Sequence, residues 1–186
     1  MSYKRPHIPK LRPVLTKLGK VALQVLESGV KQFAHEHRDR FVGRIEDQDF
    51  VSFQVVFYPE SGTNLSPRWL ARKAAKGADS RTMIATGHYV SQIKVFRQVK
   101  RGDVQFRVGF QPAVRARDLD GNTQEITLSR VARVLEHGSQ KMNIPPRPHW
   151  GPHLNLMRRE APAVRVQIAR KIRRELRKAL PGLGGR

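Results

Sequence analysis

The chain has 186 residues and a formal net charge of +21, because 36 lysine and arginine residues outnumber 15 aspartate and glutamate residues. This length fits one domain with arms at its ends, and 39% hydrophobic residues with eight phenylalanines exclude a disordered basic tail. The lack of cysteine excludes disulfides and thiolate chemistry, whereas the positive charge predicts a polyanionic or acidic partner.

The N-terminal arm, residues 1–10, is basic, but no apolar segment of signal-peptide length follows it. No apolar run in the chain approaches the roughly 18 residues that span a bilayer. We therefore expect a soluble protein with no membrane partner.

Apolar residues recur at intervals of three and four from Leu11 to His37, which predicts a long amphipathic helix. Pro13 is tolerated only in the first turn, so the helix begins near Arg12. Gly19 and Gly29 each cost about 1 kcal/mol relative to alanine inside a helix. Packing against another element must therefore hold this helix in place.

Residues 50–57 alternate apolar and polar residues imperfectly before Pro59, which predicts a strand. A helix of about three turns is expected next. Ser66 can cap this helix, Pro67 suits its first position, and Gly77 ends it.

Two strands are predicted over residues 82–99 and 102–112, joined by a turn with the sequence KRGD. They form an antiparallel hairpin with one apolar face, because Val104, Phe106, Val108 and Phe110 alternate with other residues.

Residues 114–128 form a polar excursion with a tight Asp-Gly turn. Asp118, Asp120 and Asn122 resemble the start of a calcium loop. However, the glycine comes too early and no acidic twelfth ligand follows, so a simple turn is the better interpretation.

A short helix follows, capped by Thr127 or Ser129 and stopped by Gly138. Beyond it, prolines make residues 143–150 extended and unsuited to a central strand. We name this segment the strap. It suits docking onto a folded surface, either its own sheet or a neighbouring copy, where Trp and Arg are favoured anchors. The residues expected to dock are Glu136, Gly138, Ile144, Pro145, Arg147, Pro148 and Trp150.

The last predicted helix begins at Pro162 and ends before Pro181, with an apolar residue at every fourth position from Val164. Its other faces carry more basic residues than solubility requires, and arginine suits the forked geometry of phosphate and carboxylate groups. We expect contact with a polyanion or an acidic partner through Arg165, Arg170, Lys171, Arg173, Arg174, Arg177 and Lys178.

The histidines give no metal site. His35 and His37 are two apart on a helix and point to different faces, which is wrong for shared coordination. His149 and His153 lie among prolines without a nearby carboxylate, so they are interpreted as polar loop residues. We expect neither a metal nor another cofactor.

Glu46, Asp47 and Asp49 are the closest group of carboxylates, on a predicted turn before a strand. Paired-carboxylate chemistry is an alternative there, but a solvated turn is far more common. The sequence contains no phosphate-binding glycine loop, nucleophile elbow or zinc-protease helix. We therefore expect no catalytic activity.

These elements predict an α+β fold with a long N-terminal helix, an antiparallel sheet of three or four strands, short helices and a basic C-terminal helix. The expected organisation is a basic arm over residues 1–10, one α+β domain over residues 11–160, and a basic helix and tail over residues 161–186.

Two segments of the chain carry recognisable motifs. The first is a helix end followed by an Ile-Pro-x-Arg-Pro strap, with Ala132, Glu136, Gly138, Ile144, Pro145, Arg147 and Pro148. The second contains Leu65, Ser66, Lys73, Thr86, Gly87, Ser91 and Ile93. In these positions the chain resembles the tail-completion and virion morphogenesis proteins of tailed bacteriophages, which include proteins like minor tail protein Z. It departs from their pattern where Pro146 replaces a small residue, His149-Trp150 replaces the aromatic and Tyr89 replaces leucine.

The resemblance covers roughly residues 60 to 160. It implies a structural protein of the phage neck, made in the host cytoplasm and found in the virion at the head-tail junction. Copies form a closed ring of about six or twelve. The implied partners are the head connector or adaptor, the tail terminator or tail tube, and DNA in the channel.

Two other classes of function remain open from the sequence. An independent nucleic-acid-binding protein is the main alternative, because of the strongly basic composition. A small hydrolase or nuclease that uses Asp47 and Asp49 is the weaker one.

Overall fold

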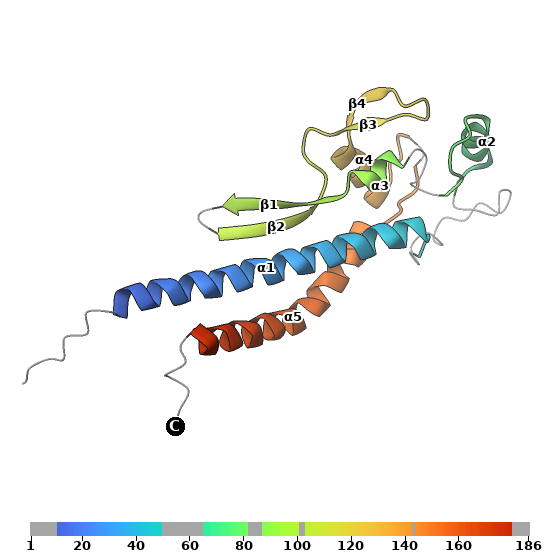
Figure 1. Ribbon diagram of the computed structural model, residues 1–186. Helices are drawn as coiled ribbons and strands as arrows, with labels where there is room; N and C mark the ends of the chain where they lie inside the picture. Colours follow the sequence, from blue (N-terminus) through green and yellow to red (C-terminus); the bar gives the residue numbers. More distant parts are fainter. Residues whose placement is uncertain (1–10, 50–64, 82–86, 101–102, 143, 180–186) are drawn as a thin grey trace, which may run out of the picture. The chain divides into compact units, whose positions relative to one another are not determined.

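The computed structural model describes residues 11–49, 65–81, 87–100, 103–142 and 144–179 (Figure 1). The chain divides into two compact units. We name residues 1–33 and 160–186 the helical unit, and residues 34–159 the α+β unit. The two longest helices, α1 (Leu11–Glu46) and α5 (Trp150–Ala179), each contribute residues to both units.

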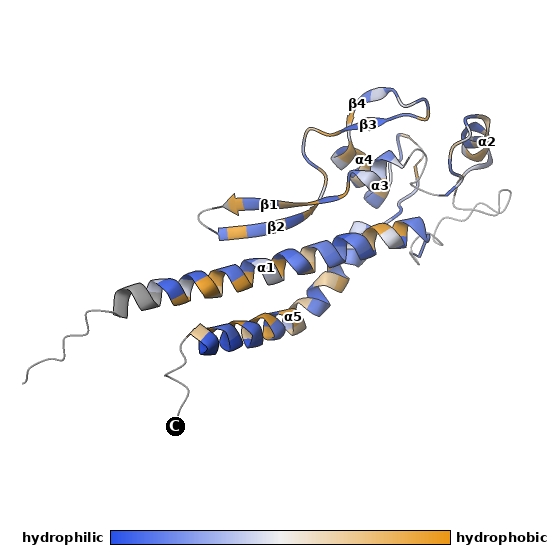
Figure 2. Ribbon diagram, viewed as in Figure 1, coloured by the Kyte–Doolittle hydropathy of each residue, from blue (hydrophilic) through white to orange (hydrophobic). Residues whose placement is uncertain are grey.

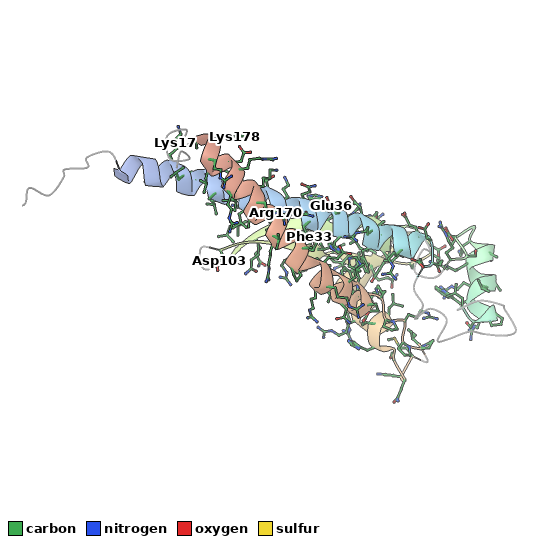
Figure 3. All side chains as sticks on the ribbon, turned by 90° about the horizontal axis from the view of Figure 1, so that it is seen from below. Lys17, Phe33, Glu36, Asp103, Arg170 and Lys178 are labelled. Atoms are coloured by element: carbon green, nitrogen blue, oxygen red, sulfur yellow. The ribbon has the colours of Figure 1, made fainter. Side chains whose placement is uncertain are left out.

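In the helical unit, the first part of α1 and the second part of α5 run antiparallel, so that Lys17 and Lys178 lie at the same end (Figure 3). The two helices approach closely at Gly29. A Cβ atom at this position would lie 2.6 Å from Cγ1 of Ile168, which is itself buried. The close contact between the helices thus explains why residue 29 is a glycine. It also supplies the packing against another element that the sequence predicts for this helix.

The first helix is confirmed, but it continues past His37 to Glu46. Its buried positions continue at intervals of three and four, from Ala34 through His37 and Phe41 to Ile45. The exposed residues Glu36, Asp39 and Arg40 lie between these buried positions, so the amphipathic pattern extends beyond the predicted end at His37.

The α+β unit is built on this second part of α1. Its core joins α1 to two shorter helices, α3 (His88–Ser91) and α4 (Leu128–His137). Side chains from the strands and from Trp150 pack against this core. The buried core residues are Phe41, Val42, Ile45, Tyr89, Val90, Ile93, Ala116, Leu128 and Ala132.

The strands of the described residues form two antiparallel sheets of two strands each. Strand β1 (Lys94–Lys100) pairs with β2 (Asp103–Gly109), which confirms the predicted hairpin. Strand β3 (Arg115–Arg117) pairs with β4 (Thr123–Thr127) across the predicted Asp-Gly turn. A turn near Pro112 separates the two sheets, with Val114 N–H donating to the Gln111 carbonyl at 3.1 Å. The strand predicted at residues 50–57 lies outside the described residues.

The predicted start of the 82–99 strand is wrong for residues 88–91, which form α3. Ser91 N–H donates to the Gly87 carbonyl at 2.9 Å, so the backbone turns through one helical turn before β1 begins. This turn buries Tyr89 and Val90 together, whereas a strand would direct neighbouring side chains to opposite faces.

The caps of the two short helices are as predicted. Ser66 accepts a hydrogen bond from Trp69 N–H at the start of α2 (Pro67–Ala75), and Pro67 occupies its first position. Thr127 accepts a hydrogen bond from Arg130 N–H at the start of α4, and Gly138 ends that helix.

The predicted start of the last helix at Pro162 is wrong, because α5 begins at Trp150 and contains Pro162 in its interior. Proline lacks the N–H group and so removes one backbone hydrogen bond inside a helix. The helical turns that precede Pro162 must therefore be stabilised by other contacts. Figure 2 shows that hydrophilic residues dominate the second part of α5. Within the described ranges, the helices include none that is long and apolar enough to cross a membrane.

Candidate functional site

Glu136 holds the first turn of α5. Its carboxylate accepts backbone hydrogen bonds from His149 at 2.8 Å, Trp150 at 2.9 Å and Gly151 at 2.9 Å. A helix N-terminus has free N–H groups and a positive dipole, both of which favour a carboxylate. Glu136 at the end of α4 therefore acts as a cap supplied from another helix.

The ionisation of Glu136 fits this capping role. Partial burial by itself would raise the pKa of Glu136, but the backbone hydrogen bonds from His149, Gly151 and Trp150 outweigh it and lower the pKa below its usual range. The side chain is thus a carboxylate at neutral pH, which is the form that accepts all three hydrogen bonds.

Gly138 lets the chain leave α4 and turn back on itself. Its φ is +74°, and a Cβ atom would lie 2.8 Å from both the Ile144 carbonyl oxygen and the Pro146 nitrogen. Ser139 and Ile144 exchange backbone hydrogen bonds of 2.7 and 2.9 Å across this turn. A side chain at residue 138 would therefore be strained and would collide with the backbone of the strap.

A chain of hydrogen bonds fixes the strap from its other end. His149 Nδ1 lies 2.8 Å from the Arg147 carbonyl, which can only accept, so Nδ1 carries the proton. His149 Nε2 then accepts from the Tyr89 hydroxyl at 2.6 Å. The Trp150 indole N–H donates to the same hydroxyl at 3.3 Å. Burial lowers the pKa of His149, with the Arg147 carbonyl and Glu136 only partly offsetting it, so a neutral ring suits this network.

The strap is seated on its own chain. Arg147 N–H donates to the Leu135 carbonyl, and the residue is 8% exposed. The Trp150 ring packs 4.2 Å from Phe41 and 5.9 Å from Phe110, measured between ring centroids. The strap thus packs chiefly on helices α4 and α1 of its own chain and not on the predicted sheet, and docking on a neighbouring copy stays a prediction.

The two segments that carry the resemblance meet in the α+β unit. Tyr89, which takes the place of leucine in the second segment, donates a hydrogen bond to His149 of the strap. Leu65 and Ser66 share a hollow of about 360 Å³ with Ile144, Pro145 and Arg147. Two of the matching residues have structural roles: Ser66 caps α2, and Ile93 is fully buried.

Lys73, another matching residue, is buried at 1% exposure although it is charged in solution. Its Nζ donates to the Arg81 carbonyl at 2.6 Å. Burial lowers the pKa of Lys73, partly offset by Asp79. The lysine ties the segment after α2 back to that helix. Thr86 lies outside the described residues.

The interpretation of the histidines as polar loop residues is wrong for His149 and His153, which are 0% and 1% exposed. His37 is also fully buried, and its ring centroid lies 5.3 Å from that of His153. Burial, together with the nearby side chains of His37, Arg44 and Arg40, lowers the pKa of His153 to about 4. The missed signal is the position of His37 on the apolar stripe of α1.

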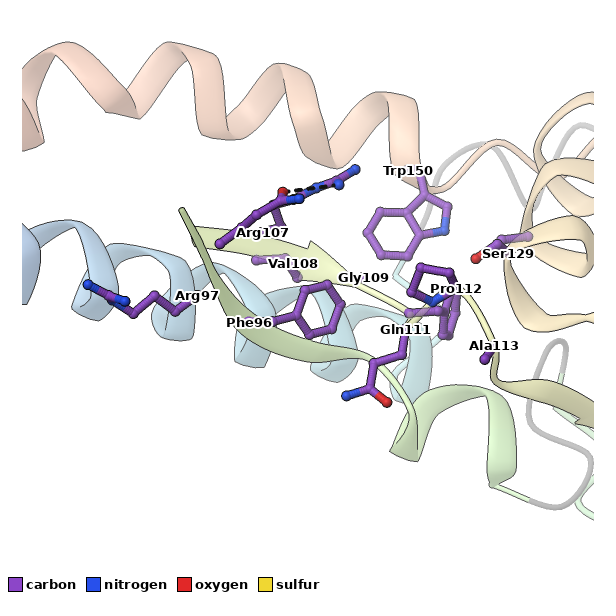
Figure 4. A pocket seen from close by; sticks show the side chains of 13 residues that line it. Phe96, Arg97, Arg107, Val108, Gly109, Gln111, Pro112, Ala113, Ser129 and Trp150 are labelled. Carbon is purple, nitrogen blue, oxygen red and sulfur yellow. Dashed lines mark hydrogen bonds between the residues drawn. The ribbon is translucent and has the colours of Figure 1, made fainter. Parts of the chain in front are cut away.

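A groove of about 840 Å³ opens between the β1–β2 hairpin and the start of α4 (Figure 4). Phe96, Phe110 and Trp150 give it an apolar lining, and Arg107 donates to Gln98 at 3.4 Å along one side. As far as the described residues go, the lining contains no histidine, lysine or carboxylate. Its only hydroxyl, that of Ser129, thus has no base beside it within the groove.

Apart from Glu136, the carboxylates considered as candidate sites stabilise a turn or are exposed to solvent. Asp118 accepts backbone hydrogen bonds of 2.9 Å from both Asp120 and Asn122, so its oxygens stabilise the turn. Glu46, Asp47 and Asp49 are exposed at the end of α1. In the part of the chain that the structure describes, no three histidine or acidic side chains are placed to hold a metal ion.

The seven basic residues predicted on the last helix are all exposed and all lie in the helical unit. The strap belongs to the α+β unit. Comparison with known protein families, with curated proteins and with solved structures gave no match.

Proposed function

We propose that this chain is a structural protein of a tailed-phage neck, where copies form a closed ring that joins the head connector to the tail after DNA packaging. The α+β unit is the body of each copy, and the helical unit is a basic arm. The chain has no catalytic step in this role. Its location is the virion, at the head-tail junction.

One observation carries the proposal. The two segments of the resemblance are far apart in the sequence, and yet their matching residues meet: Leu65 and Ser66 line one hollow with Ile144, Pro145 and Arg147. Chance matches to two separate motifs give no reason for such contacts, whereas two parts of one inherited fold require them. The contacts therefore support a likeness of the whole α+β unit.

The strap has a specific part in this role. Trp150, at the end of the strap, is bonded to Glu136 and Tyr89 and packs against Phe41. The strap is therefore part of the surface of the body and not a free arm. Head-to-tail contacts between such rigid surfaces close into a ring when the rotation between copies divides a full turn.

The test is the protein content of purified phage particles. We expect mass spectrometry to detect the chain in particles, and antibody-labelled electron microscopy to locate it at the neck. Native mass spectrometry of the purified chain should give a monomer in equilibrium with a closed ring. Absence of the chain from purified particles would refute the proposal.

A further inference from the structure

The surface of α5 changes character at Arg170. From Arg170 to Lys178, every exposed residue is lysine or arginine, and the other three residues of this stretch, Ile172, Glu175 and Leu176, are half-buried. We name the exposed set the basic arc. It consists of Arg170, Lys171, Arg173, Arg174, Arg177 and Lys178.

The basic arc lies on the side of α5 that faces away from α1. At about 100° per residue, its six positions cover roughly 160° of the helix. The apolar residues Ile168, Ile172 and Leu176 occupy the opposite side, where Ile168 meets Gly29 of α1. By the same rotation, Arg165 falls between Ile172 and Leu176, on the apolar side and outside the arc, which separates it from the other six predicted residues.

The charge of the arc is not neutralised within α5. Glu175 is the one acidic residue between positions 161 and 186. It lies 3.1 Å from Lys178 Nζ and 3.6 Å from Arg174 Nε. The hydrogen bond from Lys178 lowers the pKa of Glu175, so it is ionised, and six positive charges still face one negative charge.

The chemistry of the arc fits phosphate better than an acidic protein surface. Protein interfaces bury an apolar centre and are depleted in lysine, whereas the exposed positions of the arc include no apolar or aromatic residue. Single-stranded nucleic acid is held by aromatic stacking. Among the described residues of the helical unit, Phe33 is the only aromatic residue.

The charge density of a nucleic-acid duplex matches that of the arc. The stretch from Arg170 to Lys178 rises by about 12 Å, and double-stranded DNA carries roughly seven phosphates over the same length of its axis. The arginine forks suit phosphate oxygens. Lys17 of α1 adds a further positive charge at the same end of the helical unit as Lys178 (Figure 3).

We propose that the basic arc of α5 binds the phosphate backbone of a nucleic-acid duplex without reading its base sequence. The interaction uses no groove contacts, so different sequences of equal length bind equally. The proposal does not depend on a role in the phage neck, because it rests only on the exposed residues of α5.

The test uses the full-length chain and a fluorescent random-sequence DNA duplex of about 30 base pairs, with binding measured by anisotropy across a salt series. The arc variant carries Arg170→Gln, Arg174→Gln and Arg177→Gln. The control variant loses the same charge from the same helix, outside the arc, through Arg158→Gln, Arg159→Gln and Arg165→Gln. Glutamine keeps the helix propensity of arginine, and circular dichroism checks that both variants fold.

We expect the logarithm of the binding constant to fall with the logarithm of salt concentration with a slope of about −5 for the natural chain and about −3 for the arc variant. The arc variant should bind at least about tenfold more weakly at low salt, and the control should stay within about threefold of the natural chain. If the chain binds an RNA duplex at least as tightly as the DNA duplex, the result supports the phosphate contact and identifies RNA as the nucleic acid that the arc binds.

Three results would overturn the proposal. The first is no binding of the natural chain at low salt. The second is equal loss of affinity in the two variants, which would mean that only net charge matters. The third is displacement of the duplex by polyglutamate at an equal concentration of charge, which would identify the arc as a site for an acidic protein.

Discussion

The helical unit and the α+β unit of this chain use their positive charge differently. The helical unit has 15 basic and 3 acidic residues among 60, and the α+β unit has 21 basic and 12 acidic residues among 126. In the α+β unit, several cations hold the backbone: Arg38 donates to the Ile93 carbonyl and Lys73 to the Arg81 carbonyl. In the helical unit, the basic residues of α5 remain on the surface.

The two units also differ in what stabilises them. Nine buried hydrophobic residues form the core of the α+β unit. Among the described residues of the helical unit, Ile168 alone is buried to the same degree, while Leu23 and Leu26 are 55% and 44% exposed. The comparison teaches that the α+β unit is stabilised by a hydrophobic core of its own. The helical unit is stabilised by a narrow contact between two helices, and its surface is strongly positive.

The largest expected effect concerns the seat of the strap. Trp150→Ala should destabilise the α+β unit by about 3 kcal/mol, because it removes the ring packed against Phe41 and the hydrogen bond to Tyr89. Urea unfolding monitored by circular dichroism measures this change. The control is Trp69→Ala, which removes the chain's other tryptophan from an exposed position on α2 and should cost less than about 1 kcal/mol. Equal effects would mean that the strap is not part of the core.

Glu136→Ala should cost about 2–3 kcal/mol, because it leaves three backbone N–H groups at the start of α5 without their carboxylate. Glu136→Gln should lose less, since the amide oxygen still accepts. Glu125→Ala, at an exposed position of β4, is the matched control and should change stability by less than about 0.5 kcal/mol. A loss from Glu136→Ala no larger than from Glu125→Ala contradicts the capping role.

Acid should weaken the α+β unit before it protonates the carboxylates. The pKa of His153 is lowered to about 4, so the unfolded chain binds a proton on this side chain more readily than the folded chain. Stability should therefore fall as the pH drops from about 6.5 towards 4. Denaturant unfolding at several pH values measures the slope. His153→Gln should flatten it, whereas the exposed His35→Gln on α1 should not.

The smallest expected effects compare two glycines of α1 in the helical unit. Gly29→Ala places a Cβ atom against Ile168 and should destabilise the pair of helices by about 1 kcal/mol. Gly19 has nothing within 4 Å of its Cβ position, so Gly19→Ala should raise helix stability by up to about 1 kcal/mol. Thermal unfolding followed at 222 nm separates the two. A stabilising Gly29→Ala would mean that the helices do not approach closely there.

Local patterns identified much of the fold before the structure did. The caps at Ser66 and Thr127, the stop at Gly138 and the β1–β2 hairpin are confirmed because each depends on neighbouring residues only. The basic residues of α5 were found for the same reason. The pairing of two strands into each of two sheets was not predicted, since the turn near Pro112 separates strands whose patterns alone would suit one sheet.

The sequence by itself determined the α+β class, the long first helix, the hairpin and the concentration of charge on the last helix, because periodicity, capping and composition act over a few residues. Only the tertiary structure decided where α5 begins, where the strap is seated and which histidines are buried. These depend on contacts between distant residues, such as Glu136 with Trp150 and Tyr89 with His149. The free energy of a buried polar group depends on the partner it meets, and no local pattern specifies that partner.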